Sequence, residues 1–498
     1  MAAALARATI LRRLGPRLTQ FYVNGEWLAP LSDARLPFID PATEEEVGSI
    51  AMGSVADVER AVAAATAAFD AYAATSKTER LALLRALLVV YEERAEEMAQ
   101  AISAEMGAPI SMARDAQADC GSGHLRGFID ALDEQLQRAP LPSGDVLVRE
   151  PIGVCGLITP WNWPINQIAL KVIPALAAGC TCVLKPSELT PLSAALFAEM
   201  VHAAGFPPGV FNLVSGDGMT AGATLSKHAD VAMMSFTGST SAGVAVQIDA
   251  APSVKRVTLE LGGKSPNIVF ADCGDALVAR VEASVAECMY NTGQSCDAPT
   301  RLLVERACYD DVVEIAARAA GAQTVGSPDV EGEHIGPLVS ALQWERVQAM
   351  IAAGIDEGAR LVAGGLGRPE GDAFAKGYYV KPTVFADVDN ATMRVAREEI
   401  FGPVLVIIPF EDEEEAIAIA NDSPYGLAAY VQTGDSLRAE RVAARLRAGS
   451  VHFNGAYPEY GSPFGGYKLS GNGREGGDMG LEDYQEVKVL HGFGALAT

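Results

Sequence analysis

Positive charge is scarce in this sequence of 498 residues. Lysine and arginine total 38 against 63 aspartates and glutamates, so the formal net charge is −25. Such a surface repels phosphate backbones and anionic lipid headgroups, so we expect neither a nucleic-acid partner nor a membrane partner. The sequence also lacks an uninterrupted apolar run of about 18 residues, the length that a membrane-spanning helix needs. Its most apolar stretch, 168–184, is broken by Lys171 and Pro174.

Patterns that mark disulfide scaffolds and metal sites are missing as well. The eight cysteines are spread over the chain, unlike the dense cysteines of small secreted domains. No two histidines are four residues apart, and Cys180 and Cys182 lie in an apolar run with no second cysteine pair nearby. We therefore expect no bound metal. Reduced thiols favour a cytoplasmic protein.

The N-terminal segment carries four arginines and no acid before Glu26. This composition is compatible with an organellar transit peptide. It is also compatible with a flexible leader in front of the folded chain. We favour the second interpretation and expect residues 1–20 to be a flexible leader, with the fold beginning at Phe21.

Short apolar runs alternate with helical stretches from residue 154 onward. The first series of runs covers 154–159, 181–185, 210–214, 231–236 and 256–261. The second series follows a Gly-Gly break and covers 268–270, 301–305, 404–409 and 428–432. This alternation is typical of βαβ units, whose parallel strands are buried by helices on both faces. We predict an α/β protein with two parallel-sheet, Rossmann-like domains.

Three polar segments lie close to the ends of predicted elements. They cover 159–164, 258–264 and 291–297. In the first, Asn162 is either a donor to an oxyanion or a cap for backbone groups. In the second, burial would raise the pKa of Glu260 toward that of a general base, unless Glu260 is a paired structural acid. In the third, Cys296 is either an inert thiol or a nucleophile, which needs polar surroundings and a lowered pKa.

Taken together, the motifs of the chain resemble those of the NAD(P)-dependent aldehyde dehydrogenase superfamily from about residue 21 to the end. The matching stretches are P-W-N-W-P (160–164), K-P-S-E (185–188), F-T-G-S-T (236–240), L-E-L-G-G-K (259–264), G-Q-S-C (293–296), E-E-I-F-G-P (398–403) and P-F-G-G-Y-K-x-S-G-x-G-R-E (463–475). Seven motifs in the family's order make a chance match implausible.

The resemblance implies NAD-dependent oxidation of an aldehyde to a carboxylic acid. Cys296 would add to the carbonyl and form a thiohemiacetal, whose oxyanion the Asn162 side chain and the Cys296 backbone N–H would hold. Loss of hydride would leave a thioester, which water activated by Glu260 would hydrolyse. Lys171 and Glu475 match polar positions that support the proton path.

The cofactor contacts are likewise implied by the resemblance. A carboxylate at Glu188, beside Lys185, would accept hydrogen bonds from the adenosine ribose and repel a 2′-phosphate, which favours NAD over NADP. Gly238 and Ser239 open a helix whose N-terminus would favour the pyrophosphate. The full set of expected cofactor-binding residues is Thr159, Trp161, Lys185, Glu188, Gly218, Gly222, Gly238, Ser239, Leu261, Gln343, Glu399 and Phe401.

The expected substrate tunnel is mainly aromatic, which suits an uncharged aliphatic or aromatic aldehyde. The flanks of the nucleophile, Ser295 and Asp297, depart from the small apolar residues or cysteines that are common in the family. Asp297 could instead favour a polar or cationic aldehyde. The expected substrate residues are Trp163, Gln167, Tyr290, Ser295, Asp297, Tyr457 and Phe464.

The expected domain organisation follows from the same resemblance. Residues 21–128 and 152–261 would form the NAD-binding domain, and residues 262–469 the catalytic domain. Residues 129–151 and 470–498 would form a small β extension for oligomerisation, giving a homodimer or a homotetramer. The strand-like tail, 483–490, needs a partner strand, for which another subunit is a candidate.

Three alternatives to this function remain open. A CoA-acylating semialdehyde dehydrogenase would pass the acyl group to CoA, but such enzymes lack the glutamate that Glu260 matches. A thiol hydrolase would pair Cys296 with a histidine, and none lies near the three segments. A scaffold without activity would not be expected to keep Cys296, Glu260 and Asn162 together.

Overall fold

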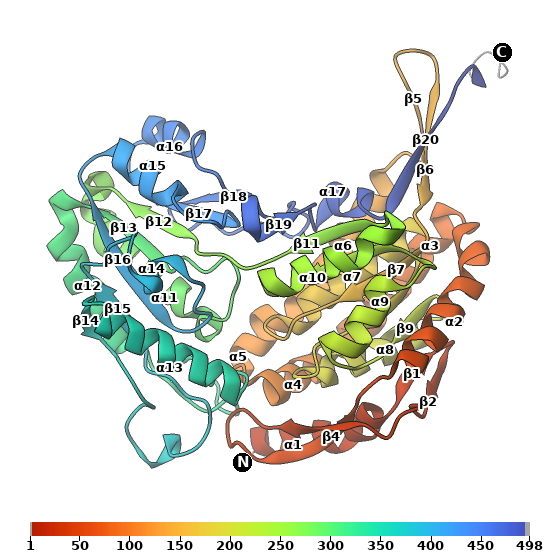
Figure 1. Ribbon diagram of the computed structural model, residues 1–498, viewed down its shortest axis with the longest axis horizontal. Coiled ribbons are helices and arrows are strands. Elements are labelled where there is room, and N and C mark those ends of the chain that lie inside the picture. Colours follow the sequence, from red (N-terminus) through yellow and green to blue (C-terminus); the bar gives the residue numbers. More distant parts are fainter. Residues whose placement is uncertain (1, 494–498) are drawn as a thin grey trace.

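The computed structural model describes residues 2–493, with side chains from residue 7 onward. Two α/β lobes lie side by side, and a β arm extends from one of them (Figure 1). Residue 1 of the expected leader and residues 494–498 of the expected tail segment lie outside the described residues. Within residues 2–493, no helix combines the length and the apolar character needed to cross a membrane.

The first lobe contains an eight-stranded sheet with the order β19-β11-β10-β7-β8-β9-β1-β2. Its central strands run parallel, and they confirm the first predicted series. Their bounds are Val154–Ile158 (β7), Thr181–Lys185 (β8), Phe211–Leu213 (β9), Val231–Thr237 (β10) and Arg256–Glu260 (β11). An antiparallel hairpin of Phe21–Val23 (β1) and Glu26–Leu28 (β2) and the short strand Gly471–Asn472 (β19) extend the two edges. A separate hairpin pairs Arg35–Ile39 (β3) with Glu46–Ala51 (β4).

Helices pack around this first sheet and bury its apolar strands. Two of them begin with a capping box, in which a serine and an acid three residues later bond each other's backbone N–H. The helices are Val55–Ala73 (α2), Lys77–Glu93 (α3), Ala95–Met106 (α4), Ile110–Met112 (α5), Asp119–Glu134 (α6), Pro164–Ala178 (α7), Pro191–Ala203 (α8), Ala223–Lys227 (α9) and Thr240–Ala250 (α10). Two π-helical turns, Ala113–Ala118 (η2) and Gly218–Gly222 (η3), interrupt this helical pattern.

The second lobe contains a seven-stranded sheet with the order β14-β15-β16-β13-β12-β17-β18. Its parallel strands are Pro266–Val269 (β12), Arg301–Glu305 (β13), Thr383–Ala386 (β15), Val404–Phe410 (β16), Ala428–Gln432 (β17) and Ser450–Phe453 (β18); Arg360–Ala363 (β14) is an antiparallel edge. The helices are Leu277–Met289 (α11), Tyr309–Ala322 (α12), Ala341–Asp356 (α13), Arg394–Arg397 (α14), Glu413–Asn421 (α15) and Ser436–Ala443 (α16).

A three-stranded antiparallel sheet forms the arm at the upper right of Figure 1. It consists of Arg138–Pro140 (β5), Val146–Pro151 (β6) and Gln485–Leu490 (β20), which follows the short helix Gly477–Glu482 (α17). The partner strand of the tail is therefore β6 of the same chain. The expected extension 129–151 begins too early, because α6 continues to Glu134.

The expectation of a flexible leader is wrong for the described residues. Ala2–Leu14 (α1) and the 3₁₀ turn Gly15–Thr19 (η1) pack on α4 and α8 of the first lobe. Ile10, Leu14 and Leu18 are buried there, at a spacing of four residues that matches one face of a helix. The Arg7 guanidinium is paired at 2.5 Å with Asp40 and at 3.4 Å with Asp329 of the second lobe. Acids on neighbouring elements thus neutralise the arginines that made this segment look like a leader.

Candidate active site

A cavity of about 140 Å³ is lined by two of the predicted catalytic residues, Asn162 and Cys296, together with several predicted cofactor contacts. It lies where β7, β10 and β11 end, opposite the Cys296 loop and the 399–401 loop of the second lobe. Ligand crevices in α/β sheets usually lie outside the carboxyl ends of the parallel strands, at the point where the strand order in the sheet reverses. The lining residues are Pro160, Trp161, Asn162, Thr237, Gly238, Ser239, Leu261, Gly262, Cys296, Gln343, Arg346, Glu399 and Phe401.

Asn162 is buried in the turn between β7 and α7. Its Nδ2 donates to the Gln294 carbonyl at 3.0 Å, which ties the turn to the loop that carries Cys296. An amide nitrogen carries two hydrogens, so one N–H remains for a group in the cavity. Asn162 and Cys296, which the motifs predict to share one site, both line this cavity.

Cys296 follows a loop in which Asn291 and Thr292 both have positive φ angles. The loop lies directly on Gly263: a Cβ there would be 2.2 Å from the Cys296 carbonyl oxygen. Burial raises the pKa of the Cys296 thiol well above its ordinary value, and the charges of Asp297 and Glu260 raise it further. The lowered pKa that a thiolate nucleophile needs is not present in the protein alone, because burial and the neighbouring carboxylates both favour the neutral thiol.

Glu260 ends β11 and is 4% exposed. Neither of its carboxyl oxygens has a hydrogen-bond partner among the described residues. Burial raises the pKa of Glu260 well above its usual range, and the negative charge of Glu475 adds to the shift. A carboxyl group without a partner and with a raised pKa has the properties of a general base rather than of a structural acid.

Lys171 and Glu475 form a buried ion pair next to Glu260. Lys171 also donates to the Thr237 hydroxyl at 2.7 Å. The charge of Lys171 lowers the pKa of Glu260 and thereby opposes part of the effect of burial. The two residues thus lie where a proton path from Glu260 would begin.

The loop around Glu399 forms the far wall of the cavity. The Glu399 carboxylate accepts from the Gly263 N–H at 2.9 Å, and a Cβ at Gly262 would lie 2.4 Å from its other oxygen. Gln343 donates to the carbonyls of Ile400 and Phe401, at 3.1 and 2.9 Å, and holds the loop in place. The ring of Trp161 meets that of Phe401 edge-on at 5.3 Å.

Of the remaining cofactor candidates, Ser239 and Leu261 line this cavity, whereas the others are not among its lining residues. Lys185 and Glu188 follow β8 and are paired at 3.3 Å. The Ser239 hydroxyl accepts from the Ala242 N–H and caps the N-terminus of α10. A Cβ at Gly222 would lie 3.7 Å from Ile158, whereas one at Gly218 would meet nothing within 4 Å. Thr159 and Leu261 are buried, and their N–H groups bond the carbonyls of Lys185 and Ser470.

The predicted substrate residues divide between buried and exposed positions. The Trp163 indole donates to the Ser295 hydroxyl at 2.8 Å, and its ring contacts that of Tyr290. Gln167 is buried with an unpartnered oxygen. Tyr457 is 75% exposed, so it is at most an entrance residue. Phe464 exchanges backbone hydrogen bonds with Glu475, and the Asp297 carbonyl accepts from the Tyr430 hydroxyl.

Several residues at the site were given no role from the sequence, although Asn291 and Gln294 lie in the polar segment 291–297. Gln117 of η2 and Asn291 bond the backbone of Asn162, and Gln294 joins them. Arg346 lines the cavity and donates to the Glu399 carbonyl at 3.0 Å. Glu287 lies close enough to Asp297 for their charges to interact, and its pKa is raised to about 7, mainly by burial. Buried amides outside a strand-end motif carry no local sequence signal.

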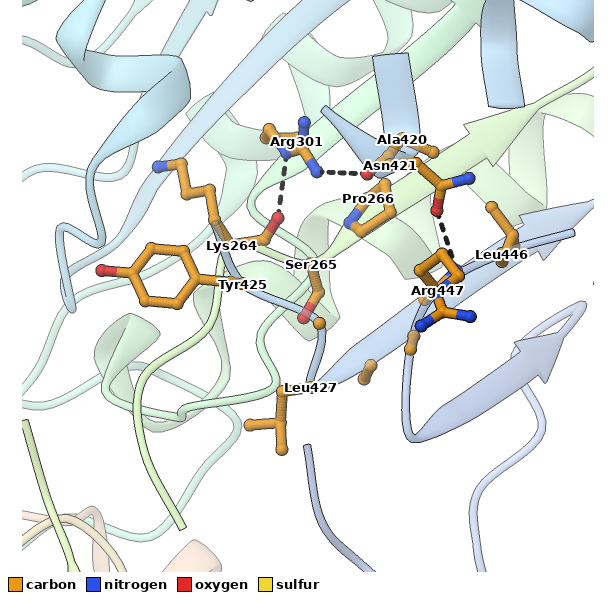
Figure 2. A pocket seen from close by; sticks show the side chains of 14 residues that line it. Lys264, Ser265, Pro266, Arg301, Ala420, Asn421, Tyr425, Leu427, Leu446 and Arg447 are labelled. Carbon is orange, nitrogen blue, oxygen red and sulfur yellow. Dashed lines mark hydrogen bonds between the residues drawn. The ribbon is translucent and has the colours of Figure 1, made fainter. Parts of the chain in front are cut away.

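A second, much smaller cavity of about 10 Å³ lies behind the glycine pair, within the second lobe (Figure 2). Arg301 is its central ionic group and is 1% exposed. The guanidinium donates to the carbonyls of Lys264, Ile419 and Ala420 and to the Asn390 side chain, all at 2.9–3.0 Å. In Figure 2 the Lys264 side chain extends away from Asn421 and Arg447.

Comparison with known proteins settles the family. The aldehyde dehydrogenase family model matches residues 27–490. The chain belongs to the aldehyde dehydrogenase family. It is an oxidoreductase of this family, and its fold class is the predicted one.

The relatives cover nearly the whole chain. A 3-succinoylsemialdehyde-pyridine dehydrogenase from a Pseudomonas species is 51% identical over 475 residues, or 95% of this chain and 98% of the relative. A crystal structure of an aldehyde dehydrogenase from Bartonella henselae matches with a TM-score of 0.92 and 50% identity, covering 95% of this chain and 98% of that one. A mutant aldehyde dehydrogenase C from Pseudomonas syringae, in complex with NAD+ and octanal, matches with a TM-score of 0.93 and 52% identity, covering 96% and 97%.

Proposed function

We propose that this aldehyde dehydrogenase oxidises an aldehyde to a carboxylic acid with NAD+, through a thioester on Cys296 that water hydrolyses. One observation carries the proposal. Cys296 and Asn162 line the same cavity, and the unpartnered carboxyl group of Glu260 is near enough to raise the pKa of the thiol. A soft nucleophile and an amide donor that line one cavity, with a candidate base nearby, support this chemistry.

In the acylation half, the Cys296 thiol gives its proton to the Glu260 carboxylate, which releases it before the second half. The sulfur bonds to the aldehyde carbon, and the carbonyl oxygen becomes an oxyanion. The Asn162 N–H that does not bond Gln294 donates to this oxygen, together with the Cys296 backbone N–H. Such a donor contributes roughly 3 kcal/mol to a transition state. Collapse of the oxyanion would break the carbon–hydrogen bond and leave a thioester on Cys296; NAD+, when bound, would supply the hydride acceptor.

In the hydrolytic half, Glu260 removes a proton from water as that water attacks the thioester. The C–S bond then breaks, and the Cys296 thiol is restored. Because burial holds the pKa of Glu260 above its usual range, its conjugate acid is weak enough for it to act as a base near neutral pH. The Lys171–Glu475 pair behind Glu260 would take the proton onward.

The chain's residues fit an NAD molecule. Gly262 has no room for a Cβ beside Glu399, and Ser239 opens α10, whose first N–H groups face the strand ends. These residues would hold the nicotinamide ribose and the pyrophosphate, respectively. Glu188 would accept from the adenosine ribose and disfavour NADP. Two solved relatives support NAD: the Pseudomonas syringae protein and a betaine aldehyde dehydrogenase from Staphylococcus aureus, which is 34% identical, are both described in complex with NAD+.

The proposed substrates are uncharged aliphatic or aromatic aldehydes. Trp163 and Tyr290 supply an aromatic wall on the Cys296 side, whereas Asp297 and Glu287 add negative charge that disfavours carboxylate-bearing aldehydes. Octanal in the Pseudomonas syringae complex is an aldehyde of the proposed kind. Asp297 keeps a cationic aldehyde as the second candidate. A panel of aldehydes read by NADH absorbance would rank these classes.

Assembly and location complete the proposal. We propose a homodimer or homotetramer built on the arm, since Val487 of β20 is 59% exposed and Val489 is 38% exposed. Sedimentation of the purified chain tests this; a monomer at micromolar concentration would contradict it. The cytoplasmic location stays a prediction.

The deciding experiment follows the acyl group. With an aldehyde and NAD+, the product should be the free acid, and added CoA should yield no acyl-CoA. Formation of acyl-CoA would replace the proposal by the CoA-acylating alternative. A lack of any aldehyde-dependent NADH would contradict both.

A further inference from the structure

A network of buried amides lies between the turn that carries Asn162 and the loop that carries Cys296. It consists of the side chains of Gln117, Asn291 and Gln294, which are at most 2% exposed. Their amide nitrogens donate to backbone carbonyls and, for Gln117, also to the Asn291 side chain and to the Met106 sulfur. We propose that Gln117 and Asn291 are positioning residues that hold the two oxyanion donors at a fixed separation.

Asn291 joins the two donor-bearing segments directly. Its Nδ2 donates to the Asn162 carbonyl at 2.9 Å and to the Gln294 carbonyl at 3.1 Å. The Gln294 carbonyl is also the acceptor of the Asn162 side chain and lies two residues before Cys296. Both hydrogens of the Asn291 amide are thus used to link one donor segment to the other. Its φ of 53° lies in the left-handed region, which asparagine tolerates better than most residues.

Gln117 sets the orientation of Asn291. Its Nε2 donates to the Asn162 carbonyl at 3.1 Å and to the Asn291 Oδ1 at 3.3 Å. This second bond requires Asn291 to present its oxygen to Gln117 and therefore its nitrogen to the two carbonyls. Without Gln117, the Asn291 amide could turn over and place an oxygen against two carbonyl oxygens.

The π-helical turn gives an independent indication that Gln117 serves the site. Residues 113–118 interrupt the α5–α6 helix with a wider turn, which shifts the phase of the helix at Gln117. Such turns cost helix geometry and are frequent at functional sites. The Gln117 side chain is also incompletely bonded: its Oε1 is buried without a partner. The polar atoms of a buried side chain that only stabilises the fold are normally all hydrogen-bonded.

The inference rests on the proposed function, because it concerns the oxyanion formed on Cys296. Removing an oxyanion donor lowers the catalytic rate about 10²–10³-fold, and displacing such a donor lowers it by a smaller factor. Gln117→Met keeps the length and packing of the side chain but removes its donated hydrogen bonds. We expect it to slow single-turnover NADH formation about tenfold, with the aldehyde KM and the NAD+ Kd changed less than about twofold.

A matched control separates positioning from stability. Gln432 is a buried glutamine of β17 that donates to the Asn267 side chain at 3.1 Å, away from the Cys296 loop. Gln432→Met should lower the melting temperature to a similar extent but leave the single-turnover rate unchanged. If Gln117→Met and Gln432→Met had equal single-turnover rates, measured well below their melting temperatures, the inference would be overturned.

A double-mutant cycle tests the route of the effect. In the Asn162→Ala background the side-chain donor is absent, so Gln117→Met should slow single turnover less than about threefold further. A full tenfold loss in that background would show that Gln117 acts elsewhere and would overturn the inference. If Gln117→Met does not fold, Asn291→Gly, which suits the positive φ, replaces it in the same cycle. Single turnover at the normal rate in Asn162→Ala alone would instead contradict the proposed function.

Discussion

Glu260 and Lys264 are four residues apart, yet they lie in two regions that differ in how their buried polar groups are hydrogen-bonded. Glu260 is buried near Cys296, and both of its carboxyl oxygens are unpartnered among the described residues. Lys264 belongs to the region of Arg301, whose guanidinium is bonded to three carbonyls and one amide around a cavity of about 10 Å³. Gly262 and Gly263 separate the two regions.

The comparison shows that buried charged groups are arranged differently in a region for chemistry and in a region that stabilises the fold. Around Arg301 the donors and acceptors are matched, as expected of a group that holds the second sheet to α15. Around Cys296 the polar atoms are left free for a substrate and water, at a cost that the rest of the fold must offset. Lys264 and Ser265 are exceptions in the Arg301 region, because the Lys264 Nζ and the Ser265 hydroxyl have no partner among the described residues.

The largest expected effect is at the open region. Cys296→Ala should abolish aldehyde-dependent NADH formation, a loss of about 10⁴-fold or more, because no other group can form the thioester. Binding of NAD+, measured by quenching of tryptophan fluorescence, should persist. Retained turnover would show that the open cavity is not the catalytic one.

Glu260→Gln should separate the two half-reactions. We expect a burst of NADH followed by steady-state turnover slowed about 10²–10⁴-fold, because the amide cannot take a proton from water. The carboxylate form of Glu260 is the active form of the base. Because its pKa is raised, wild-type turnover should increase with pH through and above the ordinary titration range of glutamate. The variant's steady state should lose this rise; an unchanged profile would remove Glu260 from the role of base.

Arg301→Met should affect stability rather than chemistry. It leaves four buried acceptors without their donor, and we expect a loss of about 2–4 kcal/mol in the free energy of unfolding by urea. The single-turnover rate of the folded protein should stay near that of the wild type. An unchanged free energy of unfolding in Arg301→Met would show that the hydrogen bonds of Arg301 do not stabilise the second region.

Lys264→Met should have the smallest effect, of about 1 kcal/mol, and in the stabilising direction. Burial lowers the pKa of Lys264 to about 7, far below its ordinary value of 10.5. Between these values the unfolded chain binds more protons than the folded one, so wild-type stability should increase from pH 7 toward 10.5. The gain from Lys264→Met should therefore be largest below pH 7 and shrink above it. A loss of stability at low pH would reveal a partner for the ammonium group.

Local patterns account for most of the secondary structure and for the motif residues. The apolar runs became strands of two parallel sheets, and Asn24–Gly25 became the turn of the first hairpin. The N-terminal helix was mistaken for a leader because its counter-charges, Asp40 and Asp329, lie far along the chain. Gln117 carried no local signal because its partners Asn162 and Asn291 are 45 and 174 residues away, and Asn291 lay in the segment 291–297 without an assigned role.

The sequence by itself determined the strand–helix alternation, the reactive residue types and the family, since these depend on neighbouring residues and on motifs. Only the tertiary structure decided which polar atoms are satisfied and which are left open. It also decided that the Cys296 thiol has a raised pKa and that the tail strand pairs within its own chain. The physical reason is that burial, charge and hydrogen bonding act between groups brought together by packing, whatever their separation in the sequence.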